Sequence, residues 1–399
     1  MMNLHSLSAL AAQFLAERGP GTPPDPAVLR AQAEYAGVPE SARDSLCELA
    51  SLVASDPALT ALYSGLLDLS CMEEYHEQTA GPMQALVLFG ALPAAREKHA
   101  ALGIPVQISS DTFHCLACAL EEYADQNEGA FGIRYYIWLR NHLKAELFQV
   151  GRLQYMLTPF TGYARVFAND SSGEVILTCR EGIAFNGDGR TCLTDGNNSA
   201  SGNLIEKNQV FPEGSWKSEY AEDTEKAAAN CLFVNGRAIR TQVLLDKAVW
   251  RQVLQEGLFR LEVHIPSGAR LNSPECTDSM QKAWQFFHKY FPDRPFETFT
   301  CNSWLLETEM QNFLPPSSGI IQFQKLFRLY PTPGTGRSFI SRVFGVDPET
   351  AGDIKEFART ADSGTGLRRG MAGYWLAGGN LRETGGIIHQ YDLIRSSMR

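Results

Sequence analysis

The middle of this 399-residue chain constrains the fold most strongly, because strand and helix patterns alternate there at short spacing. Leu258–Ile265 has the pattern of a strand, Pro274–Tyr290 that of a helix, and Phe296–Trp304 that of a second strand. Two strands joined by a helix of this length pair in parallel through a right-handed crossover. The sequence further predicts a short helix over Glu307–Phe313 and a strand over Ile320–Leu329.

The first part of the chain has helical patterns almost throughout. Apolar residues at helical spacing and capping signals predict helices over Ser41–Ala54, from Asp56 with Pro57 in its first turn, over Met83–Leu102 with an interruption at Pro93, and over Asp111–Gln126. We therefore expect a helical N-terminal domain over residues 1–147.

The remainder, residues 148–399, begins with strand patterns and becomes mixed. Asn235-Gly236 lies between two apolar runs and predicts a tight hairpin turn, and a capping signal at Asp246 predicts a short helix over Lys247–Gln255. The polar stretch Thr194–Tyr220 is expected to be a long loop. Helices are predicted to start at Asp347 and to cover Gly366–Ala377, as a C-terminal helical extension. The fold class predicted is α+β, with a mixed β-sheet flanked by helices after the helical domain.

Composition excludes several classes of function. The formal net charge of -10 argues against a nucleic-acid partner, because phosphate contacts require a basic face. No apolar run is long enough to span a membrane, so we expect a cytoplasmic protein without a membrane partner. Nine scattered cysteines indicate reduced thiols. Only Cys115 and Cys118 have metal-like spacing, and without a second such pair we expect buried helix cysteines and no metal.

Candidate catalytic residues lie on the first of the two central strands. Alternation places Leu261, Val263 and Ile265 on one face and Glu262 and His264 on the other. Pro266 follows and cannot donate a ladder hydrogen bond, so pairing is expected to stop there. Two parallel strands that lose their pairing diverge, and the slot between them exposes backbone groups. The sequence therefore predicts a slot with a carboxylate and an imidazole beside it.

The turn after this strand has features of an anion site. Gly268 permits close backbone approach, Arg270 supplies a cation, and Ser273 is a candidate N-cap for the helix that follows. A helix N-terminus attracts anions such as a pyrophosphate. However, Glu275 and Asp278 in the first turn would repel phosphate. An ordinary capped helix after a strand is therefore an equally good interpretation.

Several short segments around this turn carry a family resemblance. They are His264-Ile-Pro-Ser-Gly268, Phe286-Phe-His-Lys-Tyr-Phe-Pro292 and Cys301-Asn-Ser-Trp-Leu-Leu306. Together the segments resemble the GNAT-like C-terminal domain of bacterial acyltransferase-domain proteins, in which a helical N-terminal domain precedes it. The resemblance covers most of the chain, and its best part is about 145–330.

The resemblance implies an acyltransferase that uses acetyl-CoA or another acyl-CoA as co-substrate and a small-molecule amine or peptide as acceptor. In GNAT enzymes the fourth and fifth strands splay around the thioester, and the loop after the fourth strand binds pyrophosphate. Glu262 or His264 would then take the proton of the attacking amine, and Cys301 or Ser303 would serve as acid or nucleophile. The predicted cofactor-binding residues are Ile265, Ser267, Gly268, Ala269, Arg270 and Ser273.

A non-catalytic protein is the alternative interpretation. The usual loop of this family has two glycines where Ile265-Pro-Ser-Gly-Ala-Arg270 has one, and the segment Glu307–Phe313 has no tyrosine to protonate a leaving thiolate. These departures favour a catalytically inactive GNAT-like module that binds a ligand or a protein. Pro266 and the pairing of Glu262 with His264 favour the enzyme.

Overall fold

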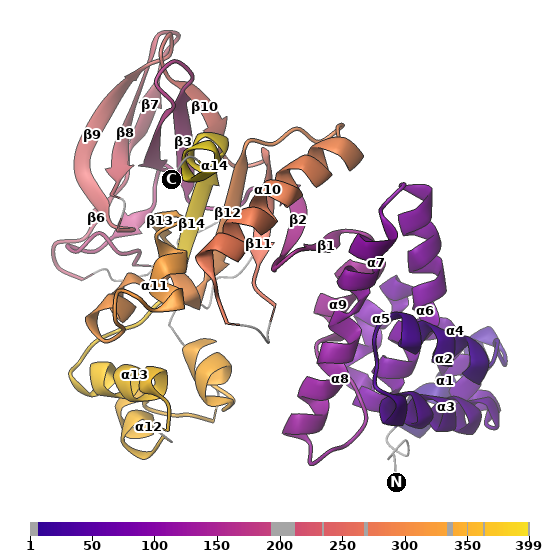
Figure 1. The fold of residues 1–399 in the computed structure, drawn as a ribbon. Helices are drawn as coiled ribbons and strands as arrows, with labels where there is room; N and C mark the ends of the chain where they lie inside the picture. Colours follow the sequence, from indigo (N-terminus) through magenta and orange to yellow (C-terminus); the bar gives the residue numbers. More distant parts are fainter. Residues whose placement is uncertain are drawn as a thin grey trace. The chain divides into compact units, whose positions relative to one another are not determined.

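The computed structural model describes residues 7–192, 212–233, 235–266, 270–332, 338–348, 350–361 and 364–397. The chain divides into two compact units. The first consists of residues 1–156 with 265–267, and the second of residues 157–264 and 268–399 (Figure 1). Within the described ranges, no helix combines the length and hydropathy that crossing a membrane requires.

The first unit is helical, as the sequence predicts. Its helices are α1 (Ser8–Arg18), α2 (Pro26–Tyr35), α3 (Glu40–Ala54), α4 (Pro57–Leu66), α5 (Leu69–Tyr75), α6 (Gly81–Ala101), α7 (Val106–Phe113), α8 (Cys115–Gln126) and α9 (Tyr136–Leu143). The Asp56 carboxylate caps α4, accepting hydrogen bonds from the backbone N–H groups of Ala58 and Leu59. The unit ends in an antiparallel pair, β1 (Leu147–Val150) and β2 (Leu153–Pro159), whose last residues belong to the second unit.

Two predictions for the first unit are wrong. Helix α6 continues through Pro93 without interruption. Burial of Leu86, Phe89 and Leu92 along the same helix offsets the hydrogen bond that the proline cannot donate. The helix predicted from Asp111 begins at Val106 instead and is divided at His114 into α7 and α8.

The central sheet of the second unit contains the predicted parallel strand pair. Its strands β11 (Phe259–His264), β12 (Thr298–Ser303), β14 (Thr384–His389) and β13 (Arg328–Pro331) lie in this spatial order. Strand β12 is parallel to β11, whereas β14 is antiparallel to both β12 and β13. Helix α10 (Ser273–Tyr290) connects β11 to β12, which confirms the strand–helix–strand interpretation.

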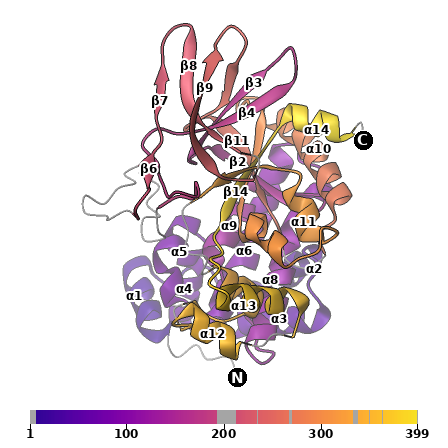
Figure 2. The same cartoon turned by 90° about the vertical axis from the view of Figure 1, so that its left-hand side faces the viewer.

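A second sheet lies in the same unit. It contains β3 (Ala164–Asn169), β4 (Glu174–Cys179), β7 (Tyr220–Glu222), β8 (Lys226–Leu232), β9 (Ala238–Asp246) and β10 (Arg251–Leu254), in the order β10-β3-β4-β8-β7, with β9 paired to β8. Figure 2 shows β8 and β9 side by side. This pair confirms the hairpin at Asn235-Gly236, where Gly236 has a φ of 75° that suits glycine.

The helix predicted over Lys247–Gln255 is wrong, because a turn and strand β10 occupy this segment. The Asp246 side chain accepts a hydrogen bond from the Ala248 N–H at 2.9 Å, as a helix cap would, yet the chain turns and returns to the sheet. Val253 and Leu254 are buried there, and tertiary packing outweighs the local signal. Of the predicted loop Thr194–Tyr220, residues 194–211 lie outside the described residues. Beyond them β6 (Trp216–Lys217) pairs with β5 (Ala184–Phe185).

The C-terminal part departs most from the sequence predictions. Helix α11 (Gly319–Gln324) replaces the first half of the strand predicted over Ile320–Leu329. The 3-10 helices η4 (Trp304–Leu306) and η5 (Thr308–Asn312) take the place of the predicted α-helix Glu307–Phe313. The helix expected from Asp347 begins only at Ile354, as α12 (Ile354–Thr360) with Asp353 as its cap. Helix α13 (Gly366–Leu376) confirms its prediction, and α14 (Gln390–Ser397) follows β14.

The two faces of the central sheet have different neighbours. Helix α10 covers the face of Leu261 and Phe299, with the ring of Trp284 6.1 Å from that of Phe299. On the other face, Tyr330 and Ile387 form an apolar cluster with residues of the second sheet such as Val166. The structure thus confirms an α+β fold in which helices and a second sheet enclose the strand pair.

Candidate functional site

Strands β11 and β12 are in register over only two residue pairs. Leu261 lies opposite Phe299 and Glu262 opposite Thr300, although β11 continues to His264 and β12 to Ser303. After His264 the chain leaves the second unit, since Ile265 and Pro266 group with the first. The two strands therefore lose their registered pairing beyond Glu262, earlier than Pro266 alone predicts.

Three polar residues line one face of β11 at this point. Arg260, Glu262 and His264 alternate with the buried Leu261 and Val263. The sequence pattern predicts this face for Glu262 and His264. The Arg260 guanidinium is 2.9 Å from the Glu262 carboxylate and also donates to the Thr158 hydroxyl. Arg260 was not predicted from the sequence, although the same alternation places it on this face. An ion pair thus holds the Glu262 carboxylate next to His264.

His264 lies next to the Glu262 carboxylate and is largely buried. Its Nε2 atom lies 3.8 Å from Oε2 of Glu262, and the two side chains are 24% and 27% exposed. Burial lowers the pKa of His264, the nearby Glu262 charge raises it, and Arg260 lowers it again, with burial dominating. The imidazole is therefore neutral at physiological pH, which is the form that accepts a proton.

The structure does not bring the other two predicted catalytic residues to this face. Opposed residues of a parallel pair share a face, so Cys301 and Ser303 lie with Phe299 on the α10 side. Cys301 is 1% exposed, and burial raises the pKa of its thiol, with Glu262 and Cys276 adding to the effect. The Ser303 hydroxyl accepts a hydrogen bond from the Leu305 N–H at 3.2 Å. A buried neutral thiol is a poor nucleophile.

The predicted cofactor-binding residues are described only in part. Ser267, Gly268 and Ala269 lie outside the described residues. Ile265 is half-buried and Arg270 is exposed. Ser273 is the first residue of α10 rather than its N-cap, and the N-cap is Asn272, whose side chain donates to Glu275 at 3.1 Å.

A pocket of about 940 Å³ opens beside the first turns of α10. Ser273 contributes to its lining, and the Ser273 hydroxyl is buried without a hydrogen-bond partner among the described residues. Lys325 and Arg328 also line the pocket, together with Asp278 and Asp392, and Arg328 pairs with Asp392 at 2.9 Å. The volume lies within the range of sites for cofactors and other organic ligands.

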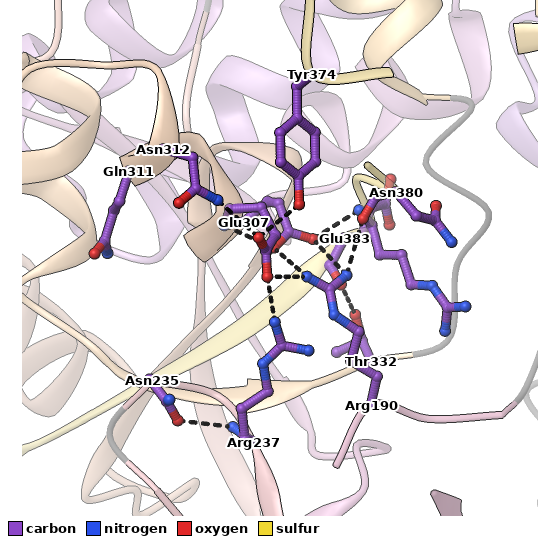
Figure 3. A network of polar contacts seen from close by, with 12 residues as sticks. Arg190, Asn235, Arg237, Glu307, Gln311, Asn312, Thr332, Tyr374, Asn380 and Glu383 are labelled. Carbon is purple, nitrogen blue, oxygen red and sulfur yellow. Dashed lines mark hydrogen bonds and ion pairs between the residues drawn. The ribbon is translucent and has the colours of Figure 1, made fainter. Parts of the chain in front are cut away.

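A separate polar network surrounds two glutamates of the segment after β12 (Figure 3). Glu309 accepts hydrogen bonds from the Tyr374 hydroxyl at 2.6 Å, from Arg190 at 2.7 Å and from Arg237. Burial alone would raise the pKa of Glu309, but the Tyr374 hydrogen bond and the two arginines outweigh it and lower that pKa. Glu307, 1% exposed, accepts from Arg190 and from the Arg382 N–H.

This network joins η5 to α13, to the β8–β9 hairpin and to the segment after β5. Its members are far apart in sequence, so no local pattern could have predicted it. The acceptor atoms of Glu309 face donors of the protein itself, and the network therefore acts structurally. Within the described ranges, no group of three or more His, Cys, Asp or Glu side chains is suited to hold a metal ion.

The fold and the site define the class of protein. A mixed sheet whose parallel central strands separate beside a carboxylate and an imidazole is a GNAT-like acyltransferase domain. Residues 147–388 match the family model of the GNAT-like C-terminal domain, and residues 28–145 match that of the N-acyltransferase N-terminal domain. The chain belongs to this acyltransferase family, which confirms the resemblance seen in the sequence.

Solved structures share the fold across nearly the whole chain. One is an acyltransferase variant in complex with octanoyl-CoA, at a TM-score of 0.59 and 16% identity, covering 97% of this chain and 96% of the other. A second is an acyltransferase in complex with decanoyl-CoA and teicoplanin, at 0.57 and 16%, covering 98% and 96%. A third is in complex with decanoyl-CoA, at 0.56 and 18%, covering 97% and 99%. No curated protein matches the chain.

Proposed function

We propose that this protein is an acyl-CoA-dependent N-acyltransferase, which transfers an acyl group directly from coenzyme A to the amine of a small molecule or peptide. The observation that carries the proposal is the loss of registered pairing between β11 and β12 beyond Glu262, with His264 partly exposed next to it. Family membership and the acyl-CoA complexes of proteins with the same fold support it.

In the proposed reaction the amine nitrogen attacks the thioester carbonyl carbon. A C–N bond forms, the C–S bond breaks, and coenzyme A leaves as a thiolate that takes a proton from solvent. His264 accepts the proton that the amine loses, because its neutral imidazole is the better base of the two candidates. Glu262, held by Arg260, stabilises the imidazolium that forms. Cys301 and Ser303 have no part in this step.

Coenzyme A would occupy the pocket beside α10, on the face of Leu329 and Ile388, and its acyl arm would pass between β11 and β12 to reach His264 on the other face. Ser273 provides a hydroxyl without a partner, Lys325 provides a cation, and the positive end of the α10 helix dipole favours a phosphate oxygen. Arg270, exposed two residues before the N-cap of α10, would add a second cation to the proposed coenzyme site.

Turnover of acyl-CoA with amine acceptors tests the proposal. The purified protein is incubated with acetyl-, octanoyl- or decanoyl-CoA and a panel of primary amines, and thiol release and product mass are measured. We expect amide products, and His264→Asn should lower kcat by about 10²–10⁴-fold. His288→Asn, which changes an exposed histidine of α10, is the matched control and should retain activity.

Binding separates the proposed enzyme from the inactive module. Calorimetric titration with the same acyl-CoAs measures affinity without turnover. Tight binding combined with no amide product from any acceptor would favour the non-catalytic alternative. Full activity of His264→Asn would show that His264 is not the base. The assignment of the protein to its family would be unaffected.

A further inference from the structure

Tyr330 of β13 lies on the same face of the central sheet as Glu262. Register shows this, since Tyr330 and Asn302 both lie opposite Gly385 of β14. Residues opposed across neighbouring strands point to the same side, and Asn302 shares its side with Thr300 and Glu262. The Tyr330 side chain therefore lies on the face that carries the proposed base.

Gly385 allows the tyrosine ring to lie flat across β14. A Cβ atom at Gly385 would overlap the ring at Cζ, the carbon that bears the hydroxyl. The hydroxyl end thus lies above the backbone of β14, about one strand spacing of 4.8 Å from β12. A Cβ atom at Gly162 would be 3.1 Å from the hydroxyl oxygen. Two glycines therefore leave the space that the phenol occupies.

The Tyr330 side chain is only 4% exposed, and its ring packs against that of Phe160 with centroids 6.4 Å apart. Burial raises the pKa of Tyr330, and the charges of Arg260, Glu262 and Cys301 act on it as well, which places the phenol within their electrostatic range. A protonated phenol is a hydrogen-bond donor, and the carbonyl oxygen of a bound ligand can accept from it.

We propose that the Tyr330 hydroxyl is a catalytic residue that donates a hydrogen bond to the thioester carbonyl oxygen of the bound acyl-CoA. This inference rests on the proposed acyl transfer. As the amine attacks, the carbonyl π electrons move to oxygen, and they return when the C–S bond breaks. Tyr330 stabilises that negative charge and transfers no proton, so His264 remains the base. A fixed donor aimed at a developing oxyanion is a common source of catalysis.

The first test is Tyr330→Phe, which keeps the ring over Gly385 and removes only the hydroxyl. We expect kcat to fall by about 10²–10³-fold with the KM for acyl-CoA nearly unchanged. The ratio of kcat for Tyr330→Phe to kcat for the unchanged protein should stay constant between about pH 6 and 9, because the phenol remains protonated there. Tyr220→Phe, at a tyrosine of β7 in the second sheet, is the matched control and should behave as the unchanged protein. Equal kcat values for Tyr330→Phe and the unchanged protein would overturn the inference.

The second test uses binding alone and so remains informative if no acceptor turns over. Decanoyl-CoA is compared with the thioether analogue in which a methylene replaces the carbonyl. The unchanged protein should prefer the thioester by about 5-fold, and Tyr330→Phe should lose that preference. The same preference in both proteins would refute the role of Tyr330. Lost preference in a protein without turnover would support Tyr330 as the carbonyl contact and refute the transferase proposal instead.

Discussion

The Nε2 atom of His264 lies 3.8 Å from Oε2 of Glu262, on the face of the sheet opposite to the Cys301 thiol. This geometry distinguishes direct acyl transfer from a covalent mechanism through Cys301, both of which the sequence allows. A base on one face and a buried thiol on the other favour direct attack by the acceptor amine. A covalent thioester of the protein itself would require both groups on one side of the strand pair.

The pH profile of the proposed reaction should have its acidic limb below the ordinary histidine range. His264 must be neutral to accept a proton, and burial lowers its pKa below 6.5. The ratio kcat/KM should therefore rise as pH increases through that lowered pKa and reach a plateau by about pH 7. Initial rates measured across this range give the limb. An acidic limb centred above pH 7 would contradict the assignment.

Replacing Glu262 should shift this limb and weaken the fold. Glu262→Gln removes the charge that raises the pKa of His264, so the limb should move to lower pH. Arg260, only 7% exposed, then loses its carboxylate partner, and the free energy of unfolding should fall by roughly 1–3 kcal/mol. Denaturant titration measures the loss. Glu275→Gln, an exposed carboxylate of α10, is the control, and an equal effect of both changes would argue against a special role for Glu262.

Cys301 should be dispensable for turnover. Because its thiol is buried and burial raises its pKa, iodoacetamide should leave Cys301 unmodified in the folded protein. Cys301→Ala should keep kcat within about threefold, since only packing against α10 changes. Mass mapping of alkylated peptides and a rate assay check both statements. If labelling of Cys301 abolishes activity, the result would instead support the covalent mechanism.

The adjacent glycines of β14 provide a matched pair of substitutions. Gly385→Ala would push the Tyr330 ring away from the Glu262 face, whereas Gly386→Ala would bring a Cβ atom within 2.7 Å of Phe327 on the α10 face. Both should destabilise the protein by roughly 1–3 kcal/mol through overpacking. Only Gly385→Ala should also lower kcat beyond the effect of stability, when both variants are assayed well below their melting temperatures. Similar kcat losses would mean that the Tyr330 position has no direct effect on the reaction.

The parts of the fold that depend on local pattern could be predicted from sequence. Alternation identified the face of Glu262 and His264, and helical spacing identified α10, because each signal lies within one element. Strand β14 was missed, since Gly385 and Gly386 favour a loop locally. Its strand conformation depends on pairing with β12 and β13 and on the aromatic rings that cover each glycine.

For the site, too, only the features that lie within one strand or helix could be predicted from the sequence. A single strand shows which residues share a face, but the face of Cys301 relative to Glu262 depends on the register between two strands. The arginine and tyrosine partners of Glu307 and Glu309 come from segments more than sixty residues away, such as Arg190 and Tyr374. Long-range pairing of this kind leaves no periodic signal in a single sequence.

Acid should weaken the second unit through Glu297. The Arg251 guanidinium, followed by His389, lowers the pKa of Glu297 from 4.5 to about 2. A carboxylate with a lowered pKa in the folded state stabilises that state above its unfolded pKa, and the contribution is lost as pH falls from about 4.5 through 2. Glu297→Gln should therefore flatten the pH dependence of the unfolding free energy in this window and cost roughly 1–3 kcal/mol at neutral pH. Asp278→Asn is the control, because its ion pair with Lys282 is exposed and contributes little. A pH dependence that is unchanged in Glu297→Gln would assign acid sensitivity to other carboxylates.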